Sequence, residues 1–267
     1  MRGEQSPLFF FPPRNTQSLD MKAAPASLQA KRVGLARALS KLGYCSRSKA
    51  AELIRAGRVR LNGAVRRNPE TPVRGAQDRI EVDSQLISRE KKIYLMLNKP
   101  RGLVTTASDD QGRDTIYSCL KDDLPWLSPI GRLDRASEGL LLLTNDSEWG
   151  ARIADPENHL PKTYHVQISA VADSSLTEKL MKGVQVDAIG WMRAKSAAIL
   201  RQGERNSWLV IVLDEGKNRQ IRRMLDALGI EVLRLIRVAI GPVELGELSK
   251  GAYRQLTKAE VTALNVS

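Results

Sequence analysis

The chain has 267 residues, of which 42% are hydrophobic, and it carries a formal net charge of +12 at pH 7. This length can form one large domain or two modest ones, and no apolar run approaches the roughly 18 residues of a membrane span, so we expect a soluble protein. Its two cysteines and two histidines argue against a disulfide framework and leave no recognisable zinc site, which indicates a reduced, cytoplasmic protein.

Residues 1–30 mix Pro, Ser, Gln and Ala without a sustained period, which predicts a flexible extension, and Met21 is a second candidate for the first residue. The basic charge begins directly after it. Residues 31–75 contain twelve Lys and Arg residues against two Glu residues, a net charge of +10. Such a concentration is typical of a module that binds a polyanion. The lack of a large aromatic and apolar face argues against a membrane surface as its target.

The same segment predicts two short helices and a small β-ribbon. Leucines recur at helical spacing over 35–42, and Ser46 is placed to cap a second helix that Gly57 ends. Alternating apolar residues at 59–61, 64–65 and 80–82, around the turn Asn62-Gly63, predict strands.

The run at 46–63 reads SRSKAAELIRAGRVRLNG and resembles the RNA-binding module named after ribosomal small-subunit protein four. The resemblance implies that residues 31–82 form an RNA-binding domain. The alternative is a small basic cap whose charges are only solvated. If the module binds RNA, the expected contacts come from Arg47, Lys49, Arg55, Arg58, Arg60, Arg66 and Arg67.

We expect a polar linker at 83–92 and a second domain over 93–267, which begins with a strand at 93–97 and a basic loop at 99–102. Further strands are expected at 140–143, 162–168, 194–200, 208–213 and 232–240. Helices are expected near 115–120, 147–154, 176–181, 215–228 and 256–264. Strands interleaved with separate helices indicate an α+β fold with a mixed, largely antiparallel sheet.

The segment 131–146, GRLDRASEGLLLLTND, is the main candidate for a reactive site. Its four leucines fit a strand buried on both faces. Asp134 precedes this strand, and a loop held by a rigid element is a common place for reactive groups. Taken alone, the segment is more simply explained as a turn in which Asp134 caps backbone amides.

Three segments together resemble the RsuA-type bacterial pseudouridine synthases, which modify ribosomal RNA. They are Gly131-Arg-Leu-Asp134 with its leucine strand, Lys162-Thr-Tyr164, and EGKNRQIRRM at 215–224. The resemblance covers about residues 33–260. It implies conversion of a uridine in RNA to pseudouridine without a metal or organic cofactor. The partners expected are ribosomal RNA or pre-ribosomal particles, with no membrane, and we expect a monomer. The particular residues in these motifs favour large-subunit over small-subunit rRNA as the substrate.

The resemblance also assigns roles to residues. Asp134 matches the catalytic aspartate, Tyr164 the aromatic residue that packs on the base and moves a proton, and Arg222 the active-site arginine. A guanidinium offsets the lost solvation of a carboxylate enclosed with a flipped base, so we expect Arg222 to pair with Asp134. Arg132 is expected to enter the space that the extruded nucleotide leaves. The remaining candidates for substrate binding are Ile221, Lys99 and Arg101.

Two other functions fit parts of the sequence. The basic module alone would suit a non-catalytic RNA-binding or ribosome-assembly factor, although the residues Asp134, Tyr164 and Arg222 in their three motifs argue against it. Hydrolysis of a glycoside or nucleoside would need a second carboxylic acid, for which Glu138 is the candidate.

Overall fold

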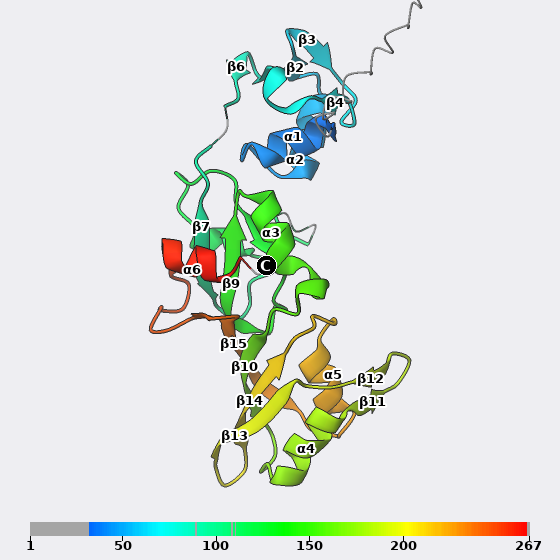
Figure 1. Ribbon diagram of the computed structural model, residues 1–267, viewed down its shortest axis with the longest axis vertical. Coiled ribbons are helices and arrows are strands. Elements are labelled where there is room, and N and C mark those ends of the chain that lie inside the picture. The colour runs from blue at the N-terminus through cyan, green and yellow to red at the C-terminus, as the bar shows by residue number, and fades with distance from the viewer. Residues whose placement is uncertain (1–31, 89, 108, 110, 266–267) are drawn as a thin grey trace, which may run out of the picture.

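The computed structural model describes residues 32–88, 90–107, 109 and 111–265. The predicted flexible extension at 1–30 lies outside these residues. The described chain forms a small N-terminal domain, in blue and cyan at the top of Figure 1, and a larger domain around a nine-stranded sheet. In this part of the chain, no helix is long and apolar enough to cross a membrane.

The N-terminal domain packs two helices against a small sheet, as the sequence predicts. The Ser46 side chain caps α2 by accepting a hydrogen bond of 3.1 Å from the Lys49 amide, and Gly57, with a left-handed φ of 75°, follows the end of this helix. The elements are β1 (Val33–Gly34), α1 (Leu35–Lys41), α2 (Arg47–Arg55), β2 (Val59–Leu61), β3 (Ala64–Arg66), β4 (Pro72–Val73), η1 (Gly75–Gln77), β5 (Ile80–Val82) and β6 (Gln85–Leu86).

Strand β6 corrects the predicted linker at 83–92. It pairs antiparallel with β5 and completes a sheet of order β3-β2-β5-β6. Two residues are too few to show an alternating pattern within a polar segment, which is why the sequence does not reveal this strand. The linker is therefore shorter than predicted.

The larger domain is built on a sheet of order β13-β14-β10-β15-β9-β7-β17, with β16 beside β15 and β8 beside β9. Among the described strands of this sheet, β15 and β9 form the one parallel pair, so the predicted mixed, largely antiparallel sheet is confirmed. The strands are β7 (Tyr94–Lys99), β8 (Ser128–Ile130), β9 (Glu138–Thr144), β10 (Lys162–Ile168), β13 (Ser196–Gln202), β14 (Ser207–Leu213), β15 (Val232–Ile240), β16 (Val243–Glu244) and β17 (Tyr253–Gln255).

Strand β9 is buried along its whole length, as its leucines predict. Leu140 and Leu142 contribute to one apolar cluster, and Leu141 and Leu143 to another, because successive side chains point to opposite faces of the sheet. Next to these leucines, a Cβ atom at Gly139 would lie 2.2 Å from a backbone oxygen of β15, and its φ is 102°. Only glycine permits this close approach of β9 and β15.

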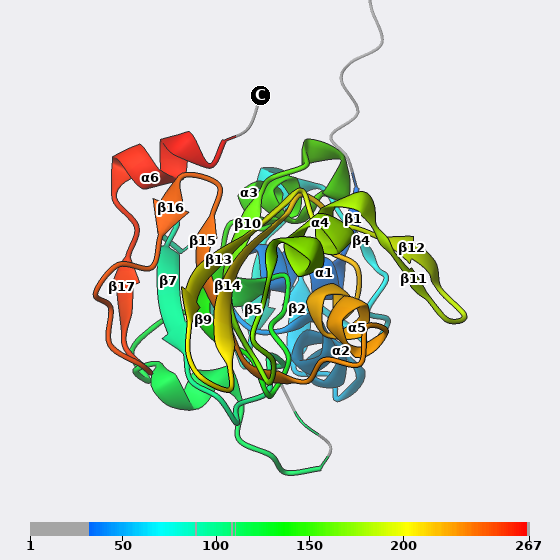
Figure 2. The ribbon, with the colours of Figure 1, turned by 90° about the horizontal axis from the view of Figure 1, so that it is seen from below.

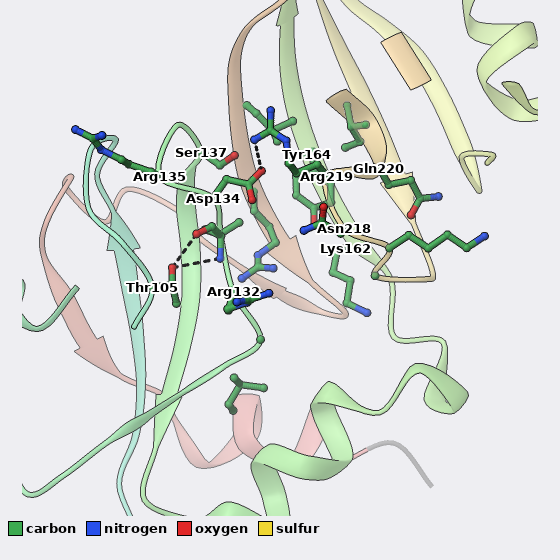
Figure 3. Close-up of a pocket in the computed structure, with 18 of the residues that line it drawn as sticks. Thr105, Arg132, Asp134, Arg135, Ser137, Lys162, Tyr164, Asn218, Arg219 and Gln220 are labelled. Carbon is green, nitrogen blue, oxygen red and sulfur yellow. Dashed lines mark hydrogen bonds and ion pairs between the residues drawn. The ribbon is translucent and has the colours of Figure 1, made fainter. Parts of the chain in front are cut away.

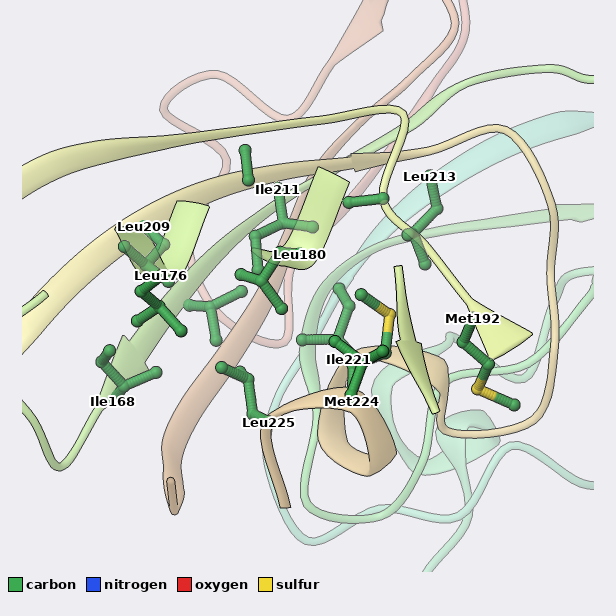
Figure 4. Packing of buried hydrophobic residues seen from close by; sticks show 14 of the residues in the cluster. Ile168, Leu176, Leu180, Met192, Leu209, Ile211, Leu213, Ile221, Met224 and Leu225 are labelled. Carbon is green, nitrogen blue, oxygen red and sulfur yellow. The ribbon is translucent and has the colours of Figure 1, made fainter. Parts of the chain in front are cut away.

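Two helices cover one face of the sheet. In Figure 2, α4 and α5 lie on the same side of the sheet. Figure 4 shows the core between them, where Leu180 of α4 and Ile221, Met224 and Leu225 of α5 pack against strands β10 and β14. The helices are η2 (Ile116–Cys119), α3 (Ser147–Ala154), η3 (Pro156–Asn158), α4 (Ser174–Lys182), α5 (Gln220–Asp226) and α6 (Lys258–Ala263).

Two features of this domain differ from the prediction. Helix α5 begins at Gln220, not near Glu215, because residues 215–219 form a loop that ends in a left-handed residue, Arg219, with a φ of 52°. The sequence also does not reveal the hairpin of β11 (Val184–Val186) and β12 (Gly190–Met192), which projects beside α5 in Figure 2. Its strands have three residues each, too few for a recognisable pattern.

Candidate active site

A cleft of about 880 Å³ opens on the face of the sheet that carries α4 and α5. The loop between β8 and β9, strand β10, the loop that leads into α5, and strand β15 meet there, and residues between β7 and η2 and at the end of α3 complete the lining. Figure 3 shows how they bring Asp134, Tyr164 and Arg219 together from distant positions in the sequence. The cleft therefore depends on the completed sheet.

Asp134 lies on the loop between β8 and β9. Its Oδ2 atom is 3.3 Å from Nη1 of Arg219, and the two side chains are 31% and 46% exposed. Thr105 fixes the preceding residue, because its hydroxyl donates to the Leu133 carbonyl at 2.8 Å and accepts from the Leu133 amide at 3.3 Å. The carboxylate is thus both oriented by its loop and open to a ligand.

Lys99 supports the Asp134 loop from inside the protein. Its residue is fully buried, and its ammonium donates to the carbonyls of Pro100 (3.0 Å), Asp134 (3.2 Å) and Ser137 (2.9 Å). Burial lowers the pKa of Lys99 from 10.5 to about 8, against the attraction of Asp134 and Glu138. Lys99 is not among the described residues that line the cleft, so in this structure it supports the Asp134 loop from below, and its predicted contact with substrate stays a prediction.

Arg222 holds the same loop from another side. The sequence predicts an ion pair between Arg222 and Asp134, but in the structure Arg219 forms the ion pair with Asp134. Arg222 donates from Nη2 to the Ala136 carbonyl at 3.1 Å and from Nη1 to the Val232 carbonyl at 3.2 Å. Burial lowers the pKa of Arg222, the charge of Arg219 lowers it further, and Asp134 opposes both. Arg222 is therefore close enough to Asp134 for their charges to interact, and it holds the backbone at Ala136, two residues after Asp134.

Tyr164 and Ile221 form an apolar side of the cleft. Tyr164 is half-buried on β10 and packs against the core of Figure 4. Ile221 is buried in that core and also lines the cleft. A half-buried aromatic ring beside an aliphatic wall can hold a flat, partly apolar ligand.

The two remaining predicted substrate residues lie at different places. Arg132 is exposed and lines the cleft two residues before Asp134. Arg101 is exposed as well, but it is not among the described residues that line the cleft. Its positive charge also lowers the pKa of Arg222. Of these two arginines, Arg132 lies at the cleft and Arg101 does not line it.

Glu138 does not provide a second acid in the cleft. Burial alone would raise the pKa of Glu138, but hydrogen bonds from Arg234 (3.1 Å) and Lys250 (2.7 Å) lower it below its ordinary value. Its side chain is buried beside these cations and is not among the described cleft residues. Within the same described part of the chain, no group of three or more His, Cys, Asp and Glu residues could hold a metal ion.

The seven basic residues predicted to contact RNA are all exposed on the N-terminal domain. Three of them also make contacts within it. Arg58 forms a two-point ion pair with Asp83, Lys49 pairs with Glu52 at 3.1 Å, and Arg67 donates to a backbone carbonyl. Between residues 32 and 88, the other four, Arg47, Arg55, Arg60 and Arg66, have no acidic partner.

Six cationic residues line the cleft without being among the predicted site residues, and Lys162, Arg219 and Arg237 are the three of them that lie beside Tyr164 or Asp134. Lys162 and Arg219 lie inside the segments that carry the family resemblance, so those segments contain a signal for them. Arg237 lies in the middle of the long, mostly apolar strand β15, and no local pattern marks it.

The comparisons with known proteins agree with this architecture. A family model described as RNA pseudouridylate synthase matches residues 93–227, and an S4 domain model matches residues 33–80. An uncharacterized RNA pseudouridine synthase of Aquifex aeolicus is 38% identical, with 85% of this chain and 91% of that protein covered. Ribosomal large subunit pseudouridine synthase B of Bacillus subtilis is 36% identical, with 86% and 94% covered. A crystal structure of a pseudouridylate synthase covers 87% of this chain and 99% of its own, at 32% identity and a TM-score of 0.61.

Proposed function

The chain belongs to the RNA pseudouridylate synthase family, and from this premise we propose that it converts a specific uridine of large-subunit ribosomal RNA to pseudouridine, with Asp134 as the catalytic aspartate. The observation that carries the proposal is the accessible Asp134 carboxylate, held 3.3 Å from Arg219 beside the ring of Tyr164. The name of the Bacillus subtilis relative supports the large subunit as the target. Small-subunit rRNA is the alternative target.

The reaction needs a carboxylate that reaches a flipped nucleotide. The bond from the uracil N1 atom to ribose must break, the base must rotate, and carbon 5 must bond to the same ribose carbon while its proton moves to N1. Asp134 acts as a nucleophile or handles the charge and proton of the sugar, and Arg219 orients it. Lys99 and Arg222, which hold its loop through the Asp134, Ser137 and Ala136 carbonyls, are positioning residues.

The other cleft residues bind the extruded base. The flat ring of Tyr164 packs on uracil, and its hydroxyl can exchange a proton with it. Ile221 supplies an apolar wall. Arg132, exposed at the cleft, enters the space that the base leaves in the RNA.

The N-terminal domain provides affinity and placement. Its exposed arginines and lysines contact phosphates of the ribosomal RNA or of a pre-ribosomal particle. A monomer contains the whole cleft, and the substrate places the reaction in the cytoplasm. Neither a metal nor an organic cofactor takes part in this proposal.

Incubation of the purified full chain with fragments of both ribosomal RNAs, followed by mapping of pseudouridines, tests the proposal. We expect pseudouridine at one position of large-subunit rRNA, none with Asp134→Asn, and normal formation with Asp187→Asn, a matched change at an exposed residue of the β11–β12 turn. If Asp134→Asn keeps a rate within about tenfold of wild type, or about 1.4 kcal/mol, Asp134 loses its assigned role. RNA binding without pseudouridine would favour the non-catalytic assembly factor instead.

A further inference from the structure

Arg237 is a buried cation without an acidic partner in the described chain. Its residue is only 5% exposed, although it lines the cleft. Its Nε atom donates to the Leu140 carbonyl at 2.8 Å, but its Nη2 atom is buried and finds no acceptor among the described residues. Buried charges in proteins are normally paired, because a charge removed from water is costly without a counter-charge. This guanidinium therefore needs an anion that the described protein does not supply.

Lys162 lies in the same cleft and also lacks an acidic partner among the described residues. It begins β10 and lies on the same face as Tyr164, two residues later. Its side chain is half-buried and forms neither a hydrogen bond nor an ion pair with the residues that the structure describes. Burial lowers the pKa of Lys162, and the positive charge of Arg237 lowers it further, while Asp214 opposes both. The two cations thus lie near each other on neighbouring strands, since Arg237 is the register partner of Tyr164 and both cations line the cleft.

The whole cleft has an excess of positive charge. Seven of its lining residues are cationic and two are acidic. Ion pairs already occupy three of the cations, in the pairs Arg113–Asp109, Lys217–Glu215 and Arg219–Asp134. No acid among the described residues pairs with the other four, which are Arg132, Arg135, Lys162 and Arg237.

We propose that Arg237 and Lys162 together bind one phosphate group of the RNA strand in the cleft, next to the nucleotide whose base lies on Tyr164. The site rests on the proposed function, since that function brings RNA to the cleft. Arg237 is the register partner of Tyr164 on the neighbouring strand, so a base on the Tyr164 ring brings its own backbone close to this guanidinium.

The chemistry of the pair favours a phosphate over the base. The planar donors of a guanidinium match two phosphate oxygens, and a lysine adds a mobile point charge to the same anion. A uracil carbonyl is neutral and would leave both charges uncompensated. The phosphate is also common to all nucleotides, so the pair fixes the position of the strand, and selection of the uridine falls to other residues.

The first test measures how tightly the full-length protein binds an rRNA fragment, chosen by binding and not by reaction, at several salt concentrations. Lys162→Met should weaken binding about tenfold, as expected for one lost charged hydrogen bond. It should also reduce the slope of log affinity against log salt by about 0.7, the value for one phosphate of a single strand. Arg237→Met should weaken binding and reduce the salt slope in the same way, provided that its thermal unfolding curve shows a folded protein. If Arg237→Met does not fold, Lys162→Met still tests the proposal, because Lys162 forms no hydrogen bond with the described residues that its replacement would remove.

The second test is interference by phosphate ethylation on the same fragment, which neutralises one phosphate at a time. In wild type, ethylation of one phosphate should block binding, and that position should become tolerant in Lys162→Met. The matched control is Lys179→Met, at an exposed position of α4, which should keep the wild-type slope and pattern.

Three outcomes overturn the site. An unchanged slope and ethylation pattern in Lys162→Met would mean that no phosphate lies there. Weaker binding with an unchanged pattern would mean that the pair contacts a base or ribose. Failure of the wild type to bind any rRNA fragment would overturn both proposals. Binding as predicted without pseudouridine formation would refute only the proposed function, which separates the two failures.

Discussion

Replacement of Arg219 by Gln should slow the reaction far more than it destabilises the protein. The ion pair with Asp134 spans 3.3 Å, and its side chains are 46% and 31% exposed. Water screens such a pair in the free protein, so we expect its loss to lower the free energy of unfolding by less than about 1 kcal/mol.

The same pair strengthens when RNA covers the cleft and displaces water. For unit charges 3.3 Å apart, Coulomb's law gives about 5 kcal/mol at an effective dielectric constant of about 20. Desolvation of both groups offsets part of this. If about half remains, Arg219→Gln loses about 2.5 kcal/mol of transition-state stabilisation, which corresponds to a rate about 70-fold lower.

The measurement is pseudouridine formation in a single turnover with excess enzyme, combined with urea unfolding of the same preparations. Arg205→Gln is the matched control, because Arg205 is exposed between β13 and β14. A rate for Arg219→Gln within about threefold of wild type, or an equal loss for Arg205→Gln, would refute this reasoning.

Three further predictions concern stability and RNA binding. Gly139→Ala should destabilise the protein by more than about 3 kcal/mol in urea unfolding, because the new Cβ would lie 2.2 Å from the Arg237 carbonyl oxygen; Gly216→Ala, with no atom within 4 Å, is the control, and equal effects would contradict the steric argument. The pKa of Lys99 is lowered from 10.5 to about 8, so between these values the unfolded chain binds more protons and the free energy of unfolding should rise with pH; a Lys99→Met protein with the same rise between pH 8 and 10 would show that another group causes it. Deletion of residues 1–82 should weaken RNA binding and flatten its salt dependence, and an unchanged slope would mean that these charges face something other than RNA.

The elements of the fold could be predicted where their apolar pattern is long. Leu140–Leu143 mark a strand buried on both faces, and Ile221, Met224 and Leu225 mark one face of a helix. Elements of two or three residues, such as β6 and β12, could not, because backbone pairing rather than side-chain pattern defines them.

The partners of Asp134 were harder to predict than its place in the cleft. Arg219 and Arg222 lie three positions apart in one motif, and the choice between them depends on a left-handed φ at Arg219, which is unusual for arginine and has no sequence signal. Lys99 belongs to a basic run, Lys99-Pro-Arg, that is typical of an exposed turn. It is buried because the Asp134 loop lies over the end of β7, a contact between segments about 35 residues apart.

The parallel contact between β9 and β15 also determines when the chain becomes competent during its synthesis. It joins Glu138 to Ile236 and Gly139 to Arg237, positions about one hundred residues apart. Contacts of such long range form slowly, since the entropy of closing a long loop opposes them. Asp134 precedes β9, whereas Tyr164 and Arg219 belong to segments on the other side of this contact. A nascent chain therefore has no complete cleft until β15 has left the ribosome and paired with β9.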